Sequence, residues 1–250
     1  MQIKIKTIKK ILGRTCLVIA GMCIFYLILL CFPQPFFSWS VSANNLTLYS
    51  DQPFSSEAGK KVLELTQAKL AASELFLSQQ HHTIFICNAR WRQRLFFNYN
   101  YGVGGVNYYP ITSNVFLRDA IIEENRLISP SGNLVPANRS LDYFVAHEIT
   151  HTLTGQAIGG FRFYQLSEWV REGYADYIGK GNTFNYQEAC QAFLAEDPEM
   201  DKQKSGLYLR YNLLVTYLLE KKHLGVQKLL QDSTEQSAVE SMLRKEISPK

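Results

Sequence analysis

The stretch FVAHEITH at residues 144–151 places His147 and His151 four residues apart, with Glu148 directly after the first histidine. Side chains four residues apart on a helix project from one face, so both imidazoles can reach a single zinc ion. Glu148 falls beside that face, where its carboxylate can reach a water molecule bound to the metal. The stretch therefore predicts a metal-binding helix that carries its own general base.

A second stretch, WVREGYADY at residues 169–177, supplies a third candidate ligand. Glu172 follows His151 by twenty-one residues, which is enough for one helix to end and a second helix to return a carboxylate to the metal. Asp176 lies one turn beyond Glu172, and we expect it to accept the free N–H of a ligating histidine. Gly173 is expected to keep this helix thin beside the ligand.

Both stretches are flanked by helix signals. Ser140 is a candidate N-cap for the first helix, and Asp142 in its first turn suits the positive end of the helix dipole. Ser167 is a candidate N-cap for the second helix, and Gly179 is a candidate stop. We therefore predict two separate helices joined by a loop.

The chain before residue 141 has a mixed pattern. Apolar residues at spacings of three and four predict a helix over 53–80, and the run TIFIC predicts a strand over 83–87. A second strand is expected over 111–117, after a glycine-rich turn at 102–105 that we interpret as flexible. From residue 141 onward the pattern is helical almost to the end. The sequence thus predicts an α+β fold, with a small sheet first and helices after it.

The N-terminal part of the chain predicts a membrane anchor. Residues 15–32 are eighteen residues without a charge, about the minimum length for a bilayer core of roughly 30 Å. Five basic residues precede this run: Lys4, Lys6, Lys9, Lys10 and Arg14. The positive-inside rule then places the N-terminus in the cytoplasm and the rest of the chain across the membrane. The expected organisation is a cytoplasmic tail 1–14, a transmembrane signal-anchor 15–32, a stalk 33–51 and a single domain 52–250.

A cleavable signal is the competing interpretation, since Val41, Ser42 and Ala43 have the small-residue pattern of a cleavage site and would yield a secreted form. We favour a retained anchor because the apolar run is long for a signal and Ala43 lies well beyond its end. The formal net charge of +4 falls to −1 without the five basic residues of the tail. Charge therefore gives no indication of a nucleic-acid partner.

Other residues with possible chemistry are expected to have structural roles. Cys16, Cys23 and Cys31 lie inside the apolar run and serve as small apolar filler. Cys87 and Cys190 lie outside it, and their pairing stays open because sequence does not define their geometry. His81 and His82 are interpreted as an exposed loop pair, and a second metal site there is the less favoured alternative.

The two motif stretches resemble those of the gluzincin metallopeptidases, most closely the peptidase MA-like group of membrane-associated and exported bacterial proteins. That family carries HExxH on one helix and W-x-x-E-G-x-A-x-Y on the next, and the resemblance extends over roughly residues 55–247. It implies a zincin-like fold and a Zn²⁺ ion bound by His147, His151 and Glu172. It also implies Glu148 as general base and a peptide or protein as substrate.

The resemblance also implies a downstream donor for the oxyanion of the reaction. Tyr208 fits the family position best, while Tyr211 and His223 are weaker candidates. The strand at 111–117 is a candidate edge for binding an extended peptide. Residues 162–164, Arg-Phe-Tyr, are expected to form a rim over the cleft.

Two alternatives belong to other functional classes. One is a membrane-anchored binding or scaffold protein that keeps the zincin-like fold and cleaves nothing. The other is a zinc hydrolase that acts on non-peptide amides. Metal analysis and a peptide-library digest separate these alternatives from a peptidase.

Overall fold

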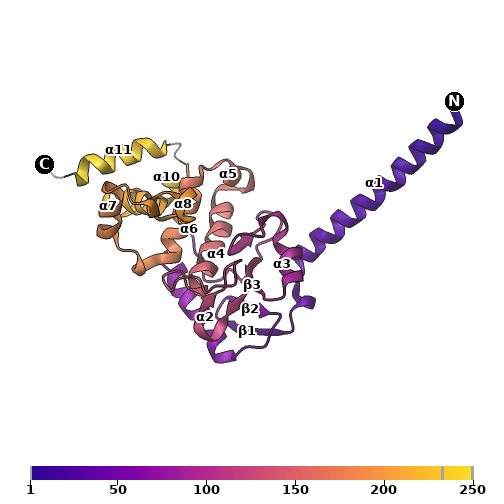
Figure 1. The fold of residues 1–250 in the computed structure, drawn as a ribbon, viewed down its shortest axis with the longest axis horizontal. Helices are drawn as coiled ribbons and strands as arrows, with labels where there is room; N and C mark the ends of the chain where they lie inside the picture. Colours follow the sequence, from indigo (N-terminus) through magenta and orange to yellow (C-terminus); the bar gives the residue numbers. More distant parts are fainter. Residues whose placement is uncertain (1, 232–233, 249–250) are drawn as a thin grey trace.

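The computed structural model describes residues 2–231 and 234–248, without the side chains of residues 2–12 and Tyr99. The chain has an α+β fold, as predicted: a sheet formed by the first half of the domain is followed by helices (Figure 1). Helix α1 (Gln2–Cys31) projects away from this domain.

Five strands form the main sheet, in the order β1-β2-β3-β5-β4. Their bounds are Trp39–Ala43 for β1, Leu46–Ser50 for β2, His82–Cys87 for β3, Gly105–Asn107 for β4 and Val115–Arg118 for β5. Strands β2, β3 and β5 run parallel, and β1 and β4 pair antiparallel at the two edges. The predicted strand at 83–87 is confirmed. The strand predicted at 111–117 is shorter and lies inside the sheet, because β4 pairs with its outer side.

Helix α2 (Ser56–Leu70) connects the parallel strands β2 and β3. It is shorter than the helix predicted over 53–80. Leu75 and Phe76, which continued the apolar periodicity, pack against the core from turns and irregular backbone. Apolar spacing marks which residues are buried, and it did not show where the helical hydrogen bonds end.

Helices make up most of the rest of the domain. Their bounds are Arg90–Phe97 for α3, Leu141–Ile158 for α4, Gly160–Gln165 for α5, Glu168–Lys180 for α6, Tyr186–Leu194 for α7, Lys202–Ser205 for α8, Leu209–Thr216 for α9, Val226–Gln231 for α10 and Gln236–Ile247 for α11. A two-stranded hairpin of β6 (Ala120–Ile121) and β7 (Arg126–Leu127) precedes α4. A π-helical turn, Tyr217–Lys221, extends α9.

Helix α4 is the central element of the core. It contacts α2 and the sheet on one side and α6 on the other, and most of its residues are buried whatever face they occupy. A helix that is covered all round is held in place by several neighbours at once. Helix α4 therefore provides a rigid support for the side chains at its centre.

The predicted stalk at 33–51 is wrong. These residues form a 3-10 turn, Gln34–Phe36, and the strands β1 and β2 of the sheet. Asn44, in the left-handed region with φ 54°, lies in the two-residue turn that joins these strands. Serine and asparagine suggested a linker, but Val41, Leu46 and Leu48 are buried as in a strand hairpin. The candidate cleavage site at Ala43 is thus the end of an integral strand.

The structure also decides the placement of His82 and the pairing of Cys87 and Cys190. His82 is wrongly described as an exposed loop residue: it begins β3 and is fully buried, and burial lowers its pKa to about 4. Cys87 and Cys190 are free thiols among the described residues, and they lie in separate hydrophobic clusters.

Helix α1 contains one segment, Gly13–Cys31, that is long and apolar enough to cross a membrane. Most of the side chains described along it are exposed. Exposure of large apolar side chains over this length is typical of a segment that contacts lipid.

Candidate metal centre

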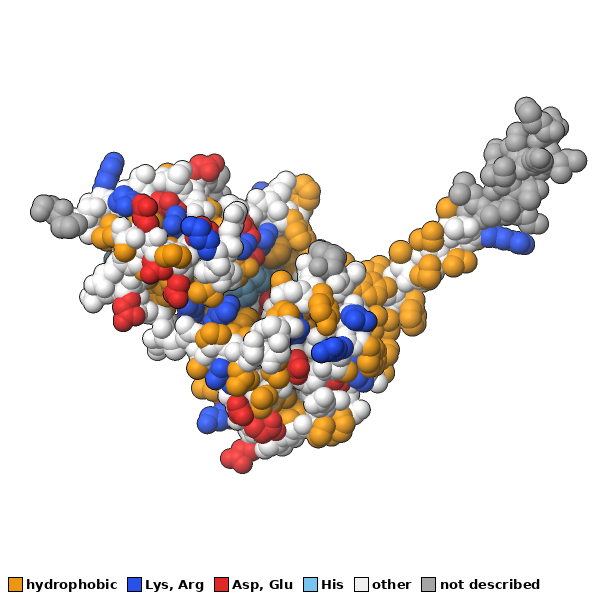
Figure 2. All heavy atoms as spheres, in the orientation of Figure 1, with side chains coloured by type: hydrophobic (Ala, Val, Ile, Leu, Met, Phe, Trp, Pro, Cys, Tyr) orange, Lys and Arg blue, Asp and Glu red, His pale blue; other side chains and the backbone are white. Residues whose placement is uncertain are grey.

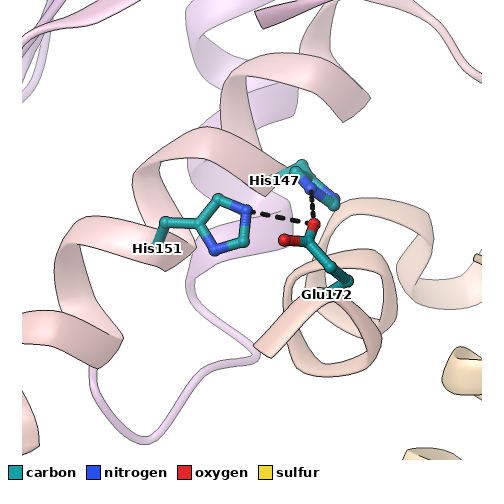
Figure 3. A group of neighbouring side chains, drawn as sticks. All are labelled: His147, His151 and Glu172. Atoms are coloured by element: carbon teal, nitrogen blue, oxygen red, sulfur yellow. Dashed lines mark ion pairs between the residues drawn. The ribbon is translucent and has the colours of Figure 1, made fainter. Parts of the chain in front are cut away.

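His147, His151 and Glu172 meet between two helices. Both histidines project from α4 toward α6, where Glu172 points back at them (Figure 3). Each histidine Nε2 lies 3.4 Å from the same oxygen, Oε2 of Glu172. The three residues are 5%, 8% and 9% exposed, respectively. The structure therefore brings together the three candidate ligands, although twenty-one residues separate the second histidine from the glutamate.

The position of Glu172 depends on how α6 packs. A Cβ atom at Gly173 would lie 2.7 Å from the backbone oxygen of Tyr211 and 2.9 Å from a methyl carbon of Val215, both in α9. Gly173 thus permits α6 and α9 to approach at the level of the ligand. Gly173 keeps α6 thin beside Glu172, as predicted, and α9 packs into the space that a side chain at residue 173 would fill.

The geometry of this group fits a metal ion. Ligands about 2.1 Å from a tetrahedral zinc ion lie about 3.4 Å from one another. The two distances from histidine Nε2 to Oε2 of Glu172 have this value, 3.4 Å. All three donor atoms lie within 4.8 Å of one another. Two imidazoles and one carboxylate also form a typical donor set for zinc. The buried group could therefore hold a metal ion.

Mutual electrostatics already favour a cation at this position. Burial alone would raise the pKa of Glu172, but the adjacent histidines outweigh it and hold the pKa well below its usual value. Burial alone would lower the pKa of His147, but its hydrogen bond to Glu172 and the charge of Glu148 raise it. Negative charge thus faces both histidines in a site with little access to water.

Glu148 lies beside the ligand group and against strand β4. It is 8% exposed, and burial raises its pKa while the two histidines partly offset this rise. A Cβ atom at Gly105 would meet Oε1 of Glu148 at 2.7 Å and its Cγ at 2.8 Å. Gly105 therefore makes room for the Glu148 side chain. The interpretation of residues 102–105 as a flexible turn missed this role, since Gly105 starts strand β4.

Strand β4 is also tied to the metal-binding helix through a side chain. Asn107 donates a hydrogen bond to the hydroxyl of Thr152 at 2.6 Å. Thr152 follows His151 directly on α4. The edge of the sheet and the helix are thus held in a defined relation at the site.

Tyr208 stands on the other side of His147. The two rings are stacked, with centroids 5.7 Å apart and planes inclined by 14°. Burial, followed by the nearby charges of Glu172 and Glu148, raises the pKa of Tyr208, so its hydroxyl stays protonated at neutral pH. Tyr211 stacks behind Tyr208, and neither Tyr211 nor His223 lines the cleft described below. Of the three candidate oxyanion donors, the structure places Tyr208 at the site.

Asp176 has other partners than those predicted. It accepts hydrogen bonds from the hydroxyl of Tyr143 and from the side-chain amide of Asn212, the latter at 2.9 Å. The Nδ1 atoms of His147 and His151 have no hydrogen-bond partner among the described residues. The prediction that Asp176 accepts a histidine N–H is therefore wrong in this structure, because Tyr143 bonds to one of its carboxylate oxygens and Asn212 to the other. The sequence analysis missed Tyr143 and Asn212, although Tyr143 lies one helical turn before His147.

The site opens into a cleft of about 620 Å³. One wall is formed by the segment from Gly102 to Tyr108, which includes β4, and another by Phe163 and Tyr164. Phe163 and Tyr164 thus form a rim, as expected, whereas Arg162 is not among the lining residues. Figure 2 shows histidine atoms recessed in a hollow of this face. The metal-binding group is therefore buried and still reachable from solvent.

Comparison with known proteins adds no family assignment. No protein-family model matches the chain, and no curated protein matches its sequence. What is known of the site consequently rests on its own residues, their burial and their distances.

Proposed function

We propose that this chain is a membrane-anchored zinc metallopeptidase of the gluzincin type, with a zincin-like fold. The observation that carries the proposal is the meeting of His147, His151 and Glu172 with both nitrogen–oxygen distances at 3.4 Å. Glu148 adjoins this group from the same helix without belonging to it. A carboxylate that is buried beside the ligand group without being one of the ligands favours a catalytic role for the site over a purely structural one.

Zinc held by these three residues would lower the pKa of a water molecule to about 7 and polarise a substrate carbonyl. Glu148 acts as the general base: its carboxylate takes a proton from the attacking water and passes it to the leaving amine. Gly105 keeps this carboxylate in place by allowing it to lie against β4. Because these side chains are buried, each of these electrostatic interactions is stronger than it would be in water.

Tyr208 supplies a hydrogen bond to the oxyanion that develops on the substrate. Its hydroxyl is protonated at neutral pH because burial and nearby carboxylates raise its pKa. A donor that is already oriented before the reaction stabilises the transition state without a reorganisation cost. The stacking of Tyr208 on His147 provides that orientation.

Strand β4 is the edge at which an extended peptide would bind. Among the described strands it pairs with β5 alone, and it lines the cleft beside Glu148. A peptide added there would continue the sheet and bring its carbonyl groups along the site. This replaces the strand at 111–117, whose structured part, β5, is already paired on both sides.

Helix α1 anchors the enzyme, with the N-terminus in the cytoplasm and the domain outside. The apolar segment Gly13–Cys31 and the five basic residues before the charge-free run support this orientation. Protease added to intact spheroplasts should digest the domain and leave the N-terminus protected. The reverse pattern would refute the orientation.

A digest of a peptide library by the full chain in detergent tests the catalytic proposal. We expect cleavage that a chelator abolishes and that zinc restores. Glu148→Gln should retain zinc and lose about 100- to 10,000-fold in turnover. Zinc binding without cleavage of any peptide would favour the scaffold or a hydrolase of non-peptide amides, and the absence of zinc from folded protein would refute the metal site.

A further inference from the structure

The C-terminal turns of α1 are part of the folded domain. Leu30 is 2% exposed and belongs to a hydrophobic cluster with Phe37 and Phe96. The side-chain amide of Asn114 donates hydrogen bonds to the carbonyl oxygens of Leu30 and Cys31, at 2.9 and 3.1 Å. No flexible linker separates the apolar helix from the domain, so the domain is held at a defined position relative to α1.

The length of the apolar run then determines how close the domain lies to the bilayer. The charge-free part of α1, residues 15–31, spans about 26 Å, against a hydrocarbon core of roughly 30 Å. If a turn of this helix lay in water, the part left to cross the hydrocarbon core would be shorter still. The hydroxyl of Tyr26, inside the run, nevertheless donates a hydrogen bond to the backbone of Leu95 in α3. The part of the domain that contacts residues 26–31 must therefore reach the lipid headgroups.

Helix α3 carries side chains suited to that depth. Trp91 is 51% exposed, and Arg90 and Arg94 are exposed beside it. Tryptophan is enriched at membrane interfaces, and arginine pairs with lipid phosphates. In Figure 2, hydrophobic side chains continue from α1 onto the adjoining face of the domain, with basic side chains among them.

Helix α5 and the loop before β5 extend the same face. The Sγ of Cys31 contacts the backbone oxygen of Ile111. The residue Ile111 is 50% exposed. The neighbouring Tyr109 accepts a hydrogen bond from the hydroxyl of Tyr164 in α5. Phe161 and Tyr164 are 79% and 62% exposed. Along the direction of the α1 axis, α5 lies about level with the point at which α1 leaves the domain (Figure 1).

We propose that this face rests in the headgroup layer of the bilayer that α1 crosses. The membrane-proximal surface consists of Arg90, Trp91, Arg94, Ile111, Phe161 and Tyr164. Lipid is the occupant because the surface continues the lipid-exposed side of α1 and combines aromatic residues with arginines. The inference rests on the proposed anchoring by α1. Since Tyr164 also lines the cleft, the mouth of the active site then faces the membrane surface.

Photo-crosslinking to lipid tests this surface. The full chain would be reconstituted in vesicles of phosphatidylcholine and phosphatidylglycerol, with benzoylphenylalanine replacing one residue at a time. The test positions are Trp91 and Phe161. Phe25, 61% exposed on α1, is the control for the anchor. Leu65, 39% exposed on α2 at the side of the domain away from α1, is the control for a surface in water (Figure 1).

We expect lipid adducts, detected by intact mass, at Phe25, Trp91 and Phe161 and only background at Leu65. Adducts at Phe25 with only background at Trp91 and Phe161 would overturn the surface and leave the anchor intact. Background at Phe25 as well would overturn both the anchor and the surface that depends on it. Adducts of twice the chain mass in place of lipid adducts would assign the surface to a second copy and refute the proposal.

Discussion

Gly105→Ala is the substitution that tests most directly how the site is built. The added methyl group would lie 2.6 Å from a methyl carbon of Leu117 and 2.7 Å from Oε1 of Glu148, well inside contact distance. Either β4 or the Glu148 carboxylate must move. Overpacking of this kind typically costs about 1 to 3 kcal/mol, and each kcal/mol lowers the Tm by about 2 to 4 °C for a chain of this size.

The expected result separates the base from the metal. The atoms nearest to a Cβ at Gly105 belong to Leu117 and Glu148 and none of them to a ligand residue, so zinc content should stay at the wild-type level. Displacement of the base by about 1 Å should lower peptide turnover about 100-fold. The assays are elemental analysis, thermal unfolding and the peptide digest.

Gly102→Ala is the matched control, because a Cβ atom at Gly102 meets no atom of the described residues within 4 Å. This variant should keep the wild-type Tm and activity. If Gly105→Ala behaves like Gly102→Ala in both assays, the Glu148 side chain is not held against β4 and the reasoning fails.

Three further predictions concern the ligands, the oxyanion donor and a buried histidine. His147→Ala should release zinc from the purified full chain, and retention of stoichiometric zinc in elemental analysis would remove it from the ligand set. Tyr208→Phe should lower turnover about 100- to 1,000-fold at unchanged zinc content, whereas Tyr211→Phe should have little effect; equal rates for the two variants would exclude Tyr208 as donor. Because the pKa of His82 is about 4 in the folded chain and 6.5 ordinarily, the unfolded chain takes up the proton first as pH falls, and folded stability is lost between these values. In denaturant titrations with chelator, the wild type should lose about 3 kcal/mol more than His82→Leu between pH 7 and pH 4, and parallel pH profiles would refute this assignment.

Local patterns predicted the motif helices well and the edges of the sheet poorly. Helices α4 and α6 begin directly after Ser140 and Ser167, as expected, because residue preferences at a helix start act over three or four residues. Neither serine side chain accepts a capping hydrogen bond from its helix. The hairpin of β1 and β2 was mistaken for a stalk because its serines and asparagines are also typical of linkers. The alternation of apolar and polar residues on both sides of the Asn44-Asn45 turn, WSVSA at 39–43 and LTLYS at 46–50, was a signal that could have identified it.

The order of residues alone predicts the spacing of His147 and His151 on one helical face, the position of Glu148 beside it, and the apolar run before the domain. These features follow from the helix period and from length, which need no knowledge of distant residues. The folded structure was needed to show that Asp176 bonds to Tyr143 and Asn212 and that Gly105 lies against Glu148. These contacts join residues tens of positions apart, and their geometry is set by the packing of the sheet and the helices around α4. Hydrogen-bonding capacity is a property of each side chain alone, but its partner is chosen by whichever group the packed core brings within reach.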